Sequence, residues 1–124
     1  MPQLGSGPTT DTSGSGYFSK DDYISILQKA RQVGVRIVPE IVAPGHNVAA
    51  IKSMEYRFKK TAEDTYRLLD PDQEKSNHSS VQNFYNNAMN PCVNGTWNFL
   101  DKVTSEIKKM HEAFMDFHNH FHIG

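Results

Sequence analysis

The chain has 124 residues and a formal net charge of −1, which is the size and charge of one modest globular domain. A near-neutral chain without a long run of one charge sign is poorly suited to bind nucleic acid or an anionic membrane surface, and no apolar stretch approaches the roughly 20 residues of a membrane span. Cys92 is the only cysteine, which excludes an internal disulfide and a paired-cysteine metal site.

The N-terminal residues 1–16 are rich in Gly, Ser, Thr and Pro, a composition that predicts a loop or flexible end rather than packed structure. A helix is expected next. Ser19 is its candidate N-cap, Asp22 completes a capping box, apolar residues recur at helical spacing, and Gly34 ends it.

The stretch that follows this helix reads VRIVPEIVAPGH and is nearly continuous in β-branched residues. This pattern predicts a buried strand over residues 36–41. Pro39 cannot donate a hydrogen bond to a neighbouring strand, and a barrel strand or an edge strand tolerates such a residue best near the strand's C-terminal end.

Two further helices and one more strand are expected in the second half. The apolar stripe in residues 47–60 predicts one helix and that in residues 96–114 another, separated by a long polar loop over residues 70–94. The alternation in residues 121–123 predicts the final strand.

This order of elements predicts an α/β fold with two parallel strands joined by a right-handed crossover. Two strands do not form a stable sheet by themselves. We therefore expect residues 17–124 to be an arc of a larger fold, with unpaired edges that favour self-association of the isolated chain.

Several side chains are candidates for binding or modification. Asn77 and Asn94 each begin an Asn-x-Ser/Thr sequon in polar, turn-rich surroundings, which predicts possible glycosylation in the secretory pathway. Trp97 has the aromatic face that a sugar stacks on, but its register with the apolar stripe favours core packing. The C-terminal region also holds the histidines His111, His118, His120 and His122. Clustered imidazoles are common metal ligands, and on a strand the last three histidines would share one face. No carboxylate or cysteine completes a recognisable ligand spacing with them.

The blocks GYFSKDDYISILQKARQVGVRIVPEIVAPGH, AAIKSMEYRFKK, LLDPD, NPC and FHIG, in this order, resemble the family-20 glycoside hydrolases, the β-N-acetylhexosaminidases, in their chitobiase-type branch. The resemblance covers about residues 16–124. It implies a partial (β/α)8 TIM barrel in which residues 36–41 form the third strand and residues 121–123 the fourth.

The resemblance also implies the chemistry. In the family, the fourth strand runs on into Gly-Asp-Glu, whose glutamate is the general acid/base and whose aspartate orients the substrate acetamido group. That pair is expected just beyond Gly124, so no catalytic residue is expected within these 124 residues and the piece alone should be inactive. The family mechanism is substrate-assisted and retaining, and it uses no metal or other cofactor.

Two residues of this chain match the family's substrate-pocket block. His46 matches the histidine of Pro-Glu-Ile-Asp-x-Pro-Gly-His and is expected to support the carboxylate network; without the resemblance it would be read as a solvated loop residue. Glu40 matches the glutamate, which either points into the pocket or forms a salt bridge on the barrel. Val42 stands where the family usually has aspartate and can neither accept a hydrogen bond nor carry a charge.

The sequence is thus interpreted as part of a secreted or lysosomal hydrolase acting on terminal N-acetylhexosamine in oligosaccharides or glycans. One alternative is a non-catalytic carbohydrate-binding or interaction protein on a degenerate barrel scaffold, which Val42 favours. Another is a small metal-binding protein built on the C-terminal histidines.

Overall fold

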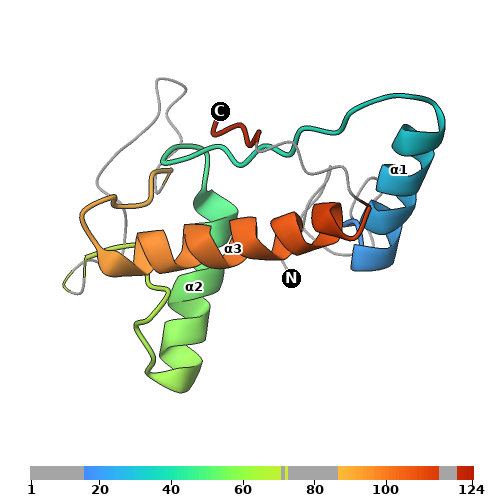
Figure 1. Cartoon of the computed structure of the whole chain (residues 1–124). Coiled ribbons are helices and arrows are strands. Elements are labelled where there is room, and N and C mark those ends of the chain that lie inside the picture. The colour runs from blue at the N-terminus through green and yellow to red at the C-terminus, as the bar shows by residue number, and fades with distance from the viewer. Residues whose placement is uncertain (1–15, 71, 73–86, 115–119) are drawn as a thin grey trace.

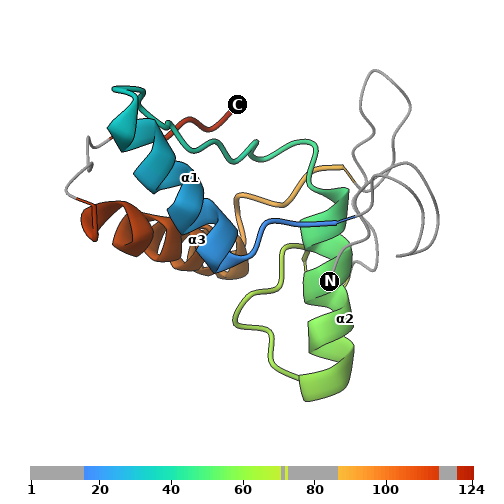
Figure 2. The ribbon, with the colours of Figure 1, turned by 90° about the vertical axis from the view of Figure 1, so that its right-hand side faces the viewer.

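The computed structural model describes residues 16–70, 72, 87–114 and 120–124. This part of the chain contains three helices, α1 (Lys20–Gln32), α2 (Val48–Thr61) and α3 (Asn94–Glu112). The long helix α3 runs across the molecule, with α1 near its C-terminal end and α2 crossing near its N-terminal half (Figures 1 and 2). All but the last residue of the predicted loop 1–16 and most of the polar stretch 70–94 lie outside the described residues.

Helix α1 begins and ends where the sequence predicts. The Asp22 backbone N–H donates to Ser19 Oγ at 3.1 Å, and the Ser19 N–H donates to the Asp22 carboxylate at 2.9 Å, so the capping box is complete. The hydrogen bond from the Ser19 side chain holds the pKa of Asp22 below its usual value. Gly34 adopts a positive φ of 69° just after the helix, the left-handed backbone that glycine takes without steric cost.

Helices α2 and α3 are held together by the apolar core. Ile51 of α2 packs there against buried residues of the connecting segments, namely Leu68, Leu69 and Met89, and Phe99 and Leu100 of α3 pack against this cluster. Beside it, Arg67 forms a two-point ion pair with Glu55, with nitrogen to oxygen distances of 3.0 and 3.1 Å. Both partners are almost buried, which makes this pair part of the packing that fixes α2 against the 67–69 segment.

Helix α1 is attached to α3 by polar contacts. Tyr23 Oη lies 2.8 Å from Nε2 of the buried His111, and the Lys20 ammonium lies 3.2 Å from the Glu106 carboxylate. Partial burial raises the pKa of Tyr23, which keeps its hydroxyl a hydrogen-bond donor.

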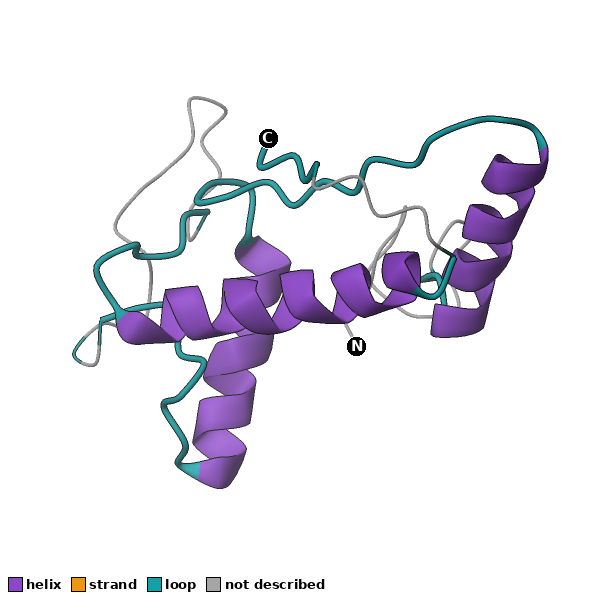
Figure 3. Ribbon diagram, viewed as in Figure 1, coloured by secondary structure: helices purple, strands orange, loops and turns teal. Residues whose placement is uncertain are grey.

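The two predicted strands are absent as strands from the described residues, which Figure 3 shows as helix and loop. Residues 36–41 and 121–123 nevertheless run side by side, and Glu40 and His122 form one isolated parallel bridge. Three backbone hydrogen bonds, each of 3.0 Å, accompany it: His122 N–H to Pro39 O, Ile41 N–H to His122 O, and Ala43 N–H to Ile123 O. The predicted strands were therefore wrong in extent, while the parallel direction of the pairing is observed.

Pro39 explains why the pairing is so short. A parallel ladder extended toward residue 38 requires an N–H at position 39, and proline has none. The pairing therefore begins at residue 40 and extends only over the last few residues before the turn that leads into α2.

Candidate functional site

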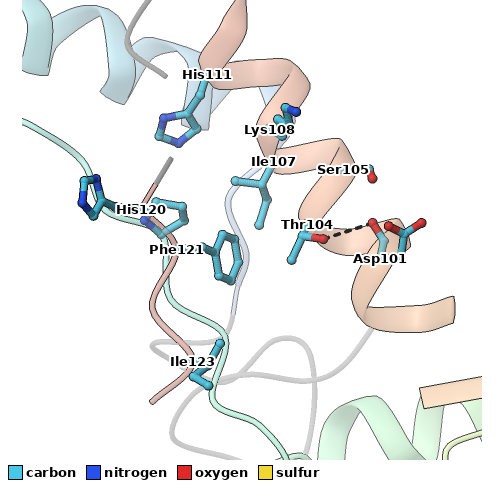
Figure 4. A pocket seen from close by; sticks show the side chains of 10 residues that line it. Asp101, Thr104, Ser105, Ile107, Lys108, His111, His120, Phe121 and Ile123 are labelled. Carbon is cyan, nitrogen blue, oxygen red and sulfur yellow. Dashed lines mark hydrogen bonds between the residues drawn. The ribbon is translucent and has the colours of Figure 1, made fainter. Parts of the chain in front are cut away.

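The alternation of side chains around the Glu40–His122 bridge defines two faces. Pro39, Phe121 and Ile123 line a half-open cavity of about 530 Å³ beside α3 together with Ile107. Figure 4 shows the Phe121 ring directed toward α3. Because successive residues of an extended chain point to opposite faces, Glu40 and His122 lie on the face away from α3.

Glu40 and His122 contact each other on the face away from α3. Glu40 Oε2 lies 2.6 Å from His122 Nδ1, and the two side chains remain 49% and 61% exposed in this chain. The Gly124 N–H also lies 3.2 Å from the same Nδ1. One ring nitrogen cannot both donate to the carboxylate and accept from the amide, so the shorter, charge-assisted contact decides that Nδ1 carries the proton. Glu40 thus contacts His122, a residue that the sequence offered only as a metal ligand, and whether it also points into a substrate pocket stays a prediction.

Val42 and Gly124 adjoin this pair on the same face. Gly124 has a φ of 90°, and a Cβ added to it would lie only 2.9 Å from Val42 Cγ1. The close approach and the left-handed backbone both favour glycine at position 124. The position at which the family usually carries aspartate is therefore packed directly against Gly124.

His46 sits at the tip of the turn that follows Val42. It is exposed, and its φ of 55° is a left-handed conformation that histidine adopts more readily than most residues. No direct contact between His46 and Glu40 is observed in the described part of the chain, so the structure does not join these two predicted pocket residues by a hydrogen bond.

Asn47 holds the His46 turn in place. Its side-chain amide donates to the carbonyl oxygens of Val42, Pro44 and Gly45, at 2.5 Å for Val42 and 3.2 Å for Pro44. Its backbone N–H donates to Asn87 O at 2.9 Å, which ties the turn to the neighbouring segment. Sequence reasoning missed Asn47, although an asparagine just after a Pro-Gly turn is a known signal for side-chain to backbone capping.

The histidines do not form a metal centre in the described residues. No group of three His, Cys, Asp or Glu side chains is placed there to hold an ion. His111 and His120 line the cavity beside α3, whereas His122 is engaged with Glu40, and His118 lies outside the described residues.

Two other predicted residues have distinct surroundings. Trp97 was expected in the core but is 59% exposed, and its indole N–H donates to Pro91 O at 2.8 Å. Asn94 is exposed at the first residue of α3, while Thr96 of the same sequon is buried with its hydroxyl bonded to Asn90 O. Asn77 lies outside the described residues, so glycosylation stays a prediction for both sites.

Comparison with known proteins identifies the family. The model of the glycosyl hydrolase family 20 catalytic domain matches residues 1–124. The chain belongs to glycosyl hydrolase family 20. The catalytic domain of this family is a TIM barrel. The described part of this chain supplies helices and two paired extended segments of such a domain.

Curated relatives agree with this family-20 assignment. The chain is 48% identical to an N,N'-diacetylchitobiase of Vibrio harveyi over 90% of its own length, and 37% identical to a beta-hexosaminidase of Vibrio vulnificus over its whole length. A beta-hexosaminidase B of Pseudoalteromonas piscicida is 38% identical, again over the whole chain. The chain spans only 14%, 15% and 17% of these relatives, about one seventh of their length. In the described residues, no helix is long and apolar enough to cross a membrane.

Proposed function

We propose that the protein carrying this chain is a β-N-acetylhexosaminidase that removes terminal N-acetylhexosamine residues from oligosaccharides or glycans. The observation that carries the proposal is the match of all 124 residues to the family-20 catalytic domain, together with 48% identity to a chitobiase. In this proposal residues 36–41 and 121–123 belong to the third and fourth strands of the barrel. The parallel bridge between Glu40 and His122 is consistent with that placement.

The proposed mechanism is substrate-assisted hydrolysis with retention. The N-acetyl oxygen of the substrate attacks the anomeric carbon while a general acid protonates the leaving oxygen, and water then opens the cyclic intermediate. We propose that the acid and the acetamido-orienting aspartate follow Gly124 in the full-length protein, as the family resemblance implies. His46 is proposed to support that carboxylate network from its turn at the C-terminal end of the third strand, the end of a barrel where active sites are built.

The experiment is an assay of the full-length protein on paired aryl glycosides. We expect hydrolysis of the aryl N-acetylglucosaminide and none of the aryl glucoside, because the glucoside lacks the acetamido group that acts as nucleophile. A thiazoline that mimics the cyclic intermediate should inhibit. Equal rates on both glycosides would exclude the substrate-assisted mechanism, and binding of chitobiose without any turnover would favour the non-catalytic alternative.

That alternative, a carbohydrate-binding protein that has lost activity, is favoured by one observation. Val42 lies beside Gly124 on the face away from α3, at the position where the family usually has aspartate. The assay above separates the two functions, since only the enzyme releases the aryl group.

For the 124-residue polypeptide alone, we propose inactivity and self-association. Several large apolar side chains are exposed, among them Val38, Trp97 and Ile123. Extended segments joined by a single bridge also leave backbone groups available for pairing with another copy. Light scattering should show a species larger than 14.0 kDa without turnover of the aryl N-acetylglucosaminide. A monodisperse, cooperatively unfolding monomer would contradict the self-association.

We also propose that the enzyme acts outside the cytoplasm, which the two sequons favour. The relatives above are bacterial and give the lysosomal alternative no support. Glycosylation at Asn77 and Asn94 remains a proposal, which a mass shift on treatment with an amidase specific for N-linked glycans would test.

A further inference from the structure

The Glu40–His122 contact is a side-chain hydrogen bond at the point where the two extended segments meet. Glu40 Oε2 and His122 Nδ1 are 2.6 Å apart, and the same two residues form the parallel backbone bridge. Pro39 removes the hydrogen bond that would otherwise continue the pairing on one side. The side-chain contact therefore reinforces the pairing at a place where the backbone alone offers few bonds.

The pair also lies on the face that matters for the proposed chemistry. Pro39, Phe121 and Ile123 are turned toward α3, so Glu40 and His122 face the opposite side, which in a TIM barrel is the interior. Val42 and Gly124 come next along the same face and touch each other. The Val42 carbonyl in turn accepts from Asn47, the residue that holds the His46 turn.

We propose that Glu40 and His122 are a positioning pair, which fixes the register of the two segments and thereby sets where Val42, Gly124 and the His46 turn lie. The pair acts through the backbone and does not contact the substrate. This inference rests on the proposed hexosaminidase function for its effect on rate, while its structural part stands independently.

The rate measurement uses the full-length protein and the variants Glu40→Ala, His122→Ala, their combination and Glu40→Gln. Each alanine variant should lower kcat about tenfold and leave KM within about twofold, because misplacement of supporting groups acts on the chemical step. The kcat of the double variant should be no lower than that of the more impaired single variant, since the two residues work as one unit. Glu40→Gln should keep at least half of the rate, because its Oε1 still accepts from His122 Nδ1–H.

Arg57 and Glu63 provide a matched control pair. Their contact is also 2.6 Å and similarly exposed, but it lies at the far end of α2 from the bridge (Figure 1). Glu63→Ala should leave both kcat and KM unchanged.

Amide exchange measured by mass spectrometry gives a readout that does not depend on activity. A peptide covering residues 36–43 should exchange faster in Glu40→Ala and His122→Ala than in the wild type, because the Ile41 and Ala43 amides lose their partners. The same peptide should be unaffected in Glu63→Ala. If wild-type protein hydrolyses nothing, the proposed function fails, and the exchange result still decides whether the pair holds the register.

The outcomes against the proposal are distinct. Unchanged exchange in Glu40→Ala would overturn it whatever the rate, and faster exchange with unchanged kcat would deny the pair any effect on catalysis. A rise in KM at constant kcat would place Glu40 on the substrate, and additive losses in the double variant would show two independent residues.

If the alanine variants do not fold, Glu40→Asp replaces them. Its carboxylate is one methylene too short, so the proposal expects faster exchange and lower kcat, and wild-type behaviour would overturn it.

Discussion

Replacing His46 tests the proposed site most directly, and its backbone conformation decides how the test is designed. At a φ of 55°, an alanine would carry the steric cost of the left-handed region, about 1–2 kcal/mol, whereas a glycine would not. His46→Gly therefore removes the imidazole without adding backbone strain. We expect its free energy of unfolding to stay within about 1 kcal/mol of the wild type, because the relief of strain offsets the greater chain entropy of glycine.

The expected effect on rate comes from the lost imidazole. For a residue that supports a general acid, we expect kcat in the full-length protein to fall about 100-fold, which corresponds to about 2.7 kcal/mol of transition-state stabilisation. KM should change by no more than about twofold, because the effect falls on the transition state and not on uniform binding. Initial rates on an aryl N-acetylglucosaminide and a thermal unfolding curve measure both quantities.

Gly34 supplies the control for the backbone term. It has a φ of 69° and nothing within 4 Å of an added Cβ, so Gly34→Ala introduces left-handed strain at a position remote from the site. It should lower stability by about 1–2 kcal/mol and leave kcat unchanged. Equal losses of kcat in His46→Gly and His46→Ala would support the imidazole. A glycine variant with wild-type kcat beside an impaired alanine variant would refute the reasoning, since the turn and not the imidazole would then be what matters.

Three further predictions concern the site and the scaffold. Val42→Asp in the full-length enzyme should raise kcat if the family carboxylate is what this site lacks, and Val42→Asn should not; equal rates in both would show that charge at this position has no role. Gly95→Ala should destabilise by about 3 kcal/mol, at the upper end of overpacking costs, because its Cβ would lie 2.0 Å from Arg67 O, while Gly16→Ala, with open space around it, should be neutral in thermal unfolding. The hydrogen bond from Lys102, with Lys20 and Lys109 nearby, lowers the pKa of Glu106 to about 2 from an ordinary value of 4.5. A depressed pKa contributes stability above about pH 4.5 that is lost as the pH falls toward 2, so Glu106→Gln should flatten the acid side of the stability curve slightly. The difference should shrink in high salt because the network is exposed, and an unchanged acid slope would contradict it.

The helices were predictable because their signals are local. The Ser19–Asp22 capping box and Gly34 mark the two ends of α1 within a few residues of sequence. The apolar stripes of α2 and α3 gave their faces, although Trp97 shows the limit of that reasoning. Trp97 lies in register with Leu100, but it is near the start of α3, where the described residues leave one side of the helix uncovered. Periodicity identifies the face of a helix and not what covers it.

The strands were harder to predict because pairing depends on residues far apart in the chain. A run of β-branched residues predicted a strand over residues 36–41. Within that range only Glu40 forms a bridge, and its partner His122 lies about 80 positions further along the chain. The reason lies in Pro39. Its missing N–H restricts the ladder to the residues that follow it.

The contact between Glu40 and His122 depends on the same register, which explains why sequence reasoning did not predict it. Phe121 and Ile123 line the cavity beside α3, and a shift of one residue would turn both away from it. The alternation of the extended chain therefore puts residue 122 on the opposite face, and the backbone hydrogen bonds to Pro39 and Ile41 set residue 40 beside it. Packing determines that two side chains must meet at this point, but it does not require them to be a carboxylate and an imidazole. Two apolar residues would fill the same positions, so packing alone does not explain this hydrogen-bonded pair, whereas a role in fixing the register of the two segments would account for it.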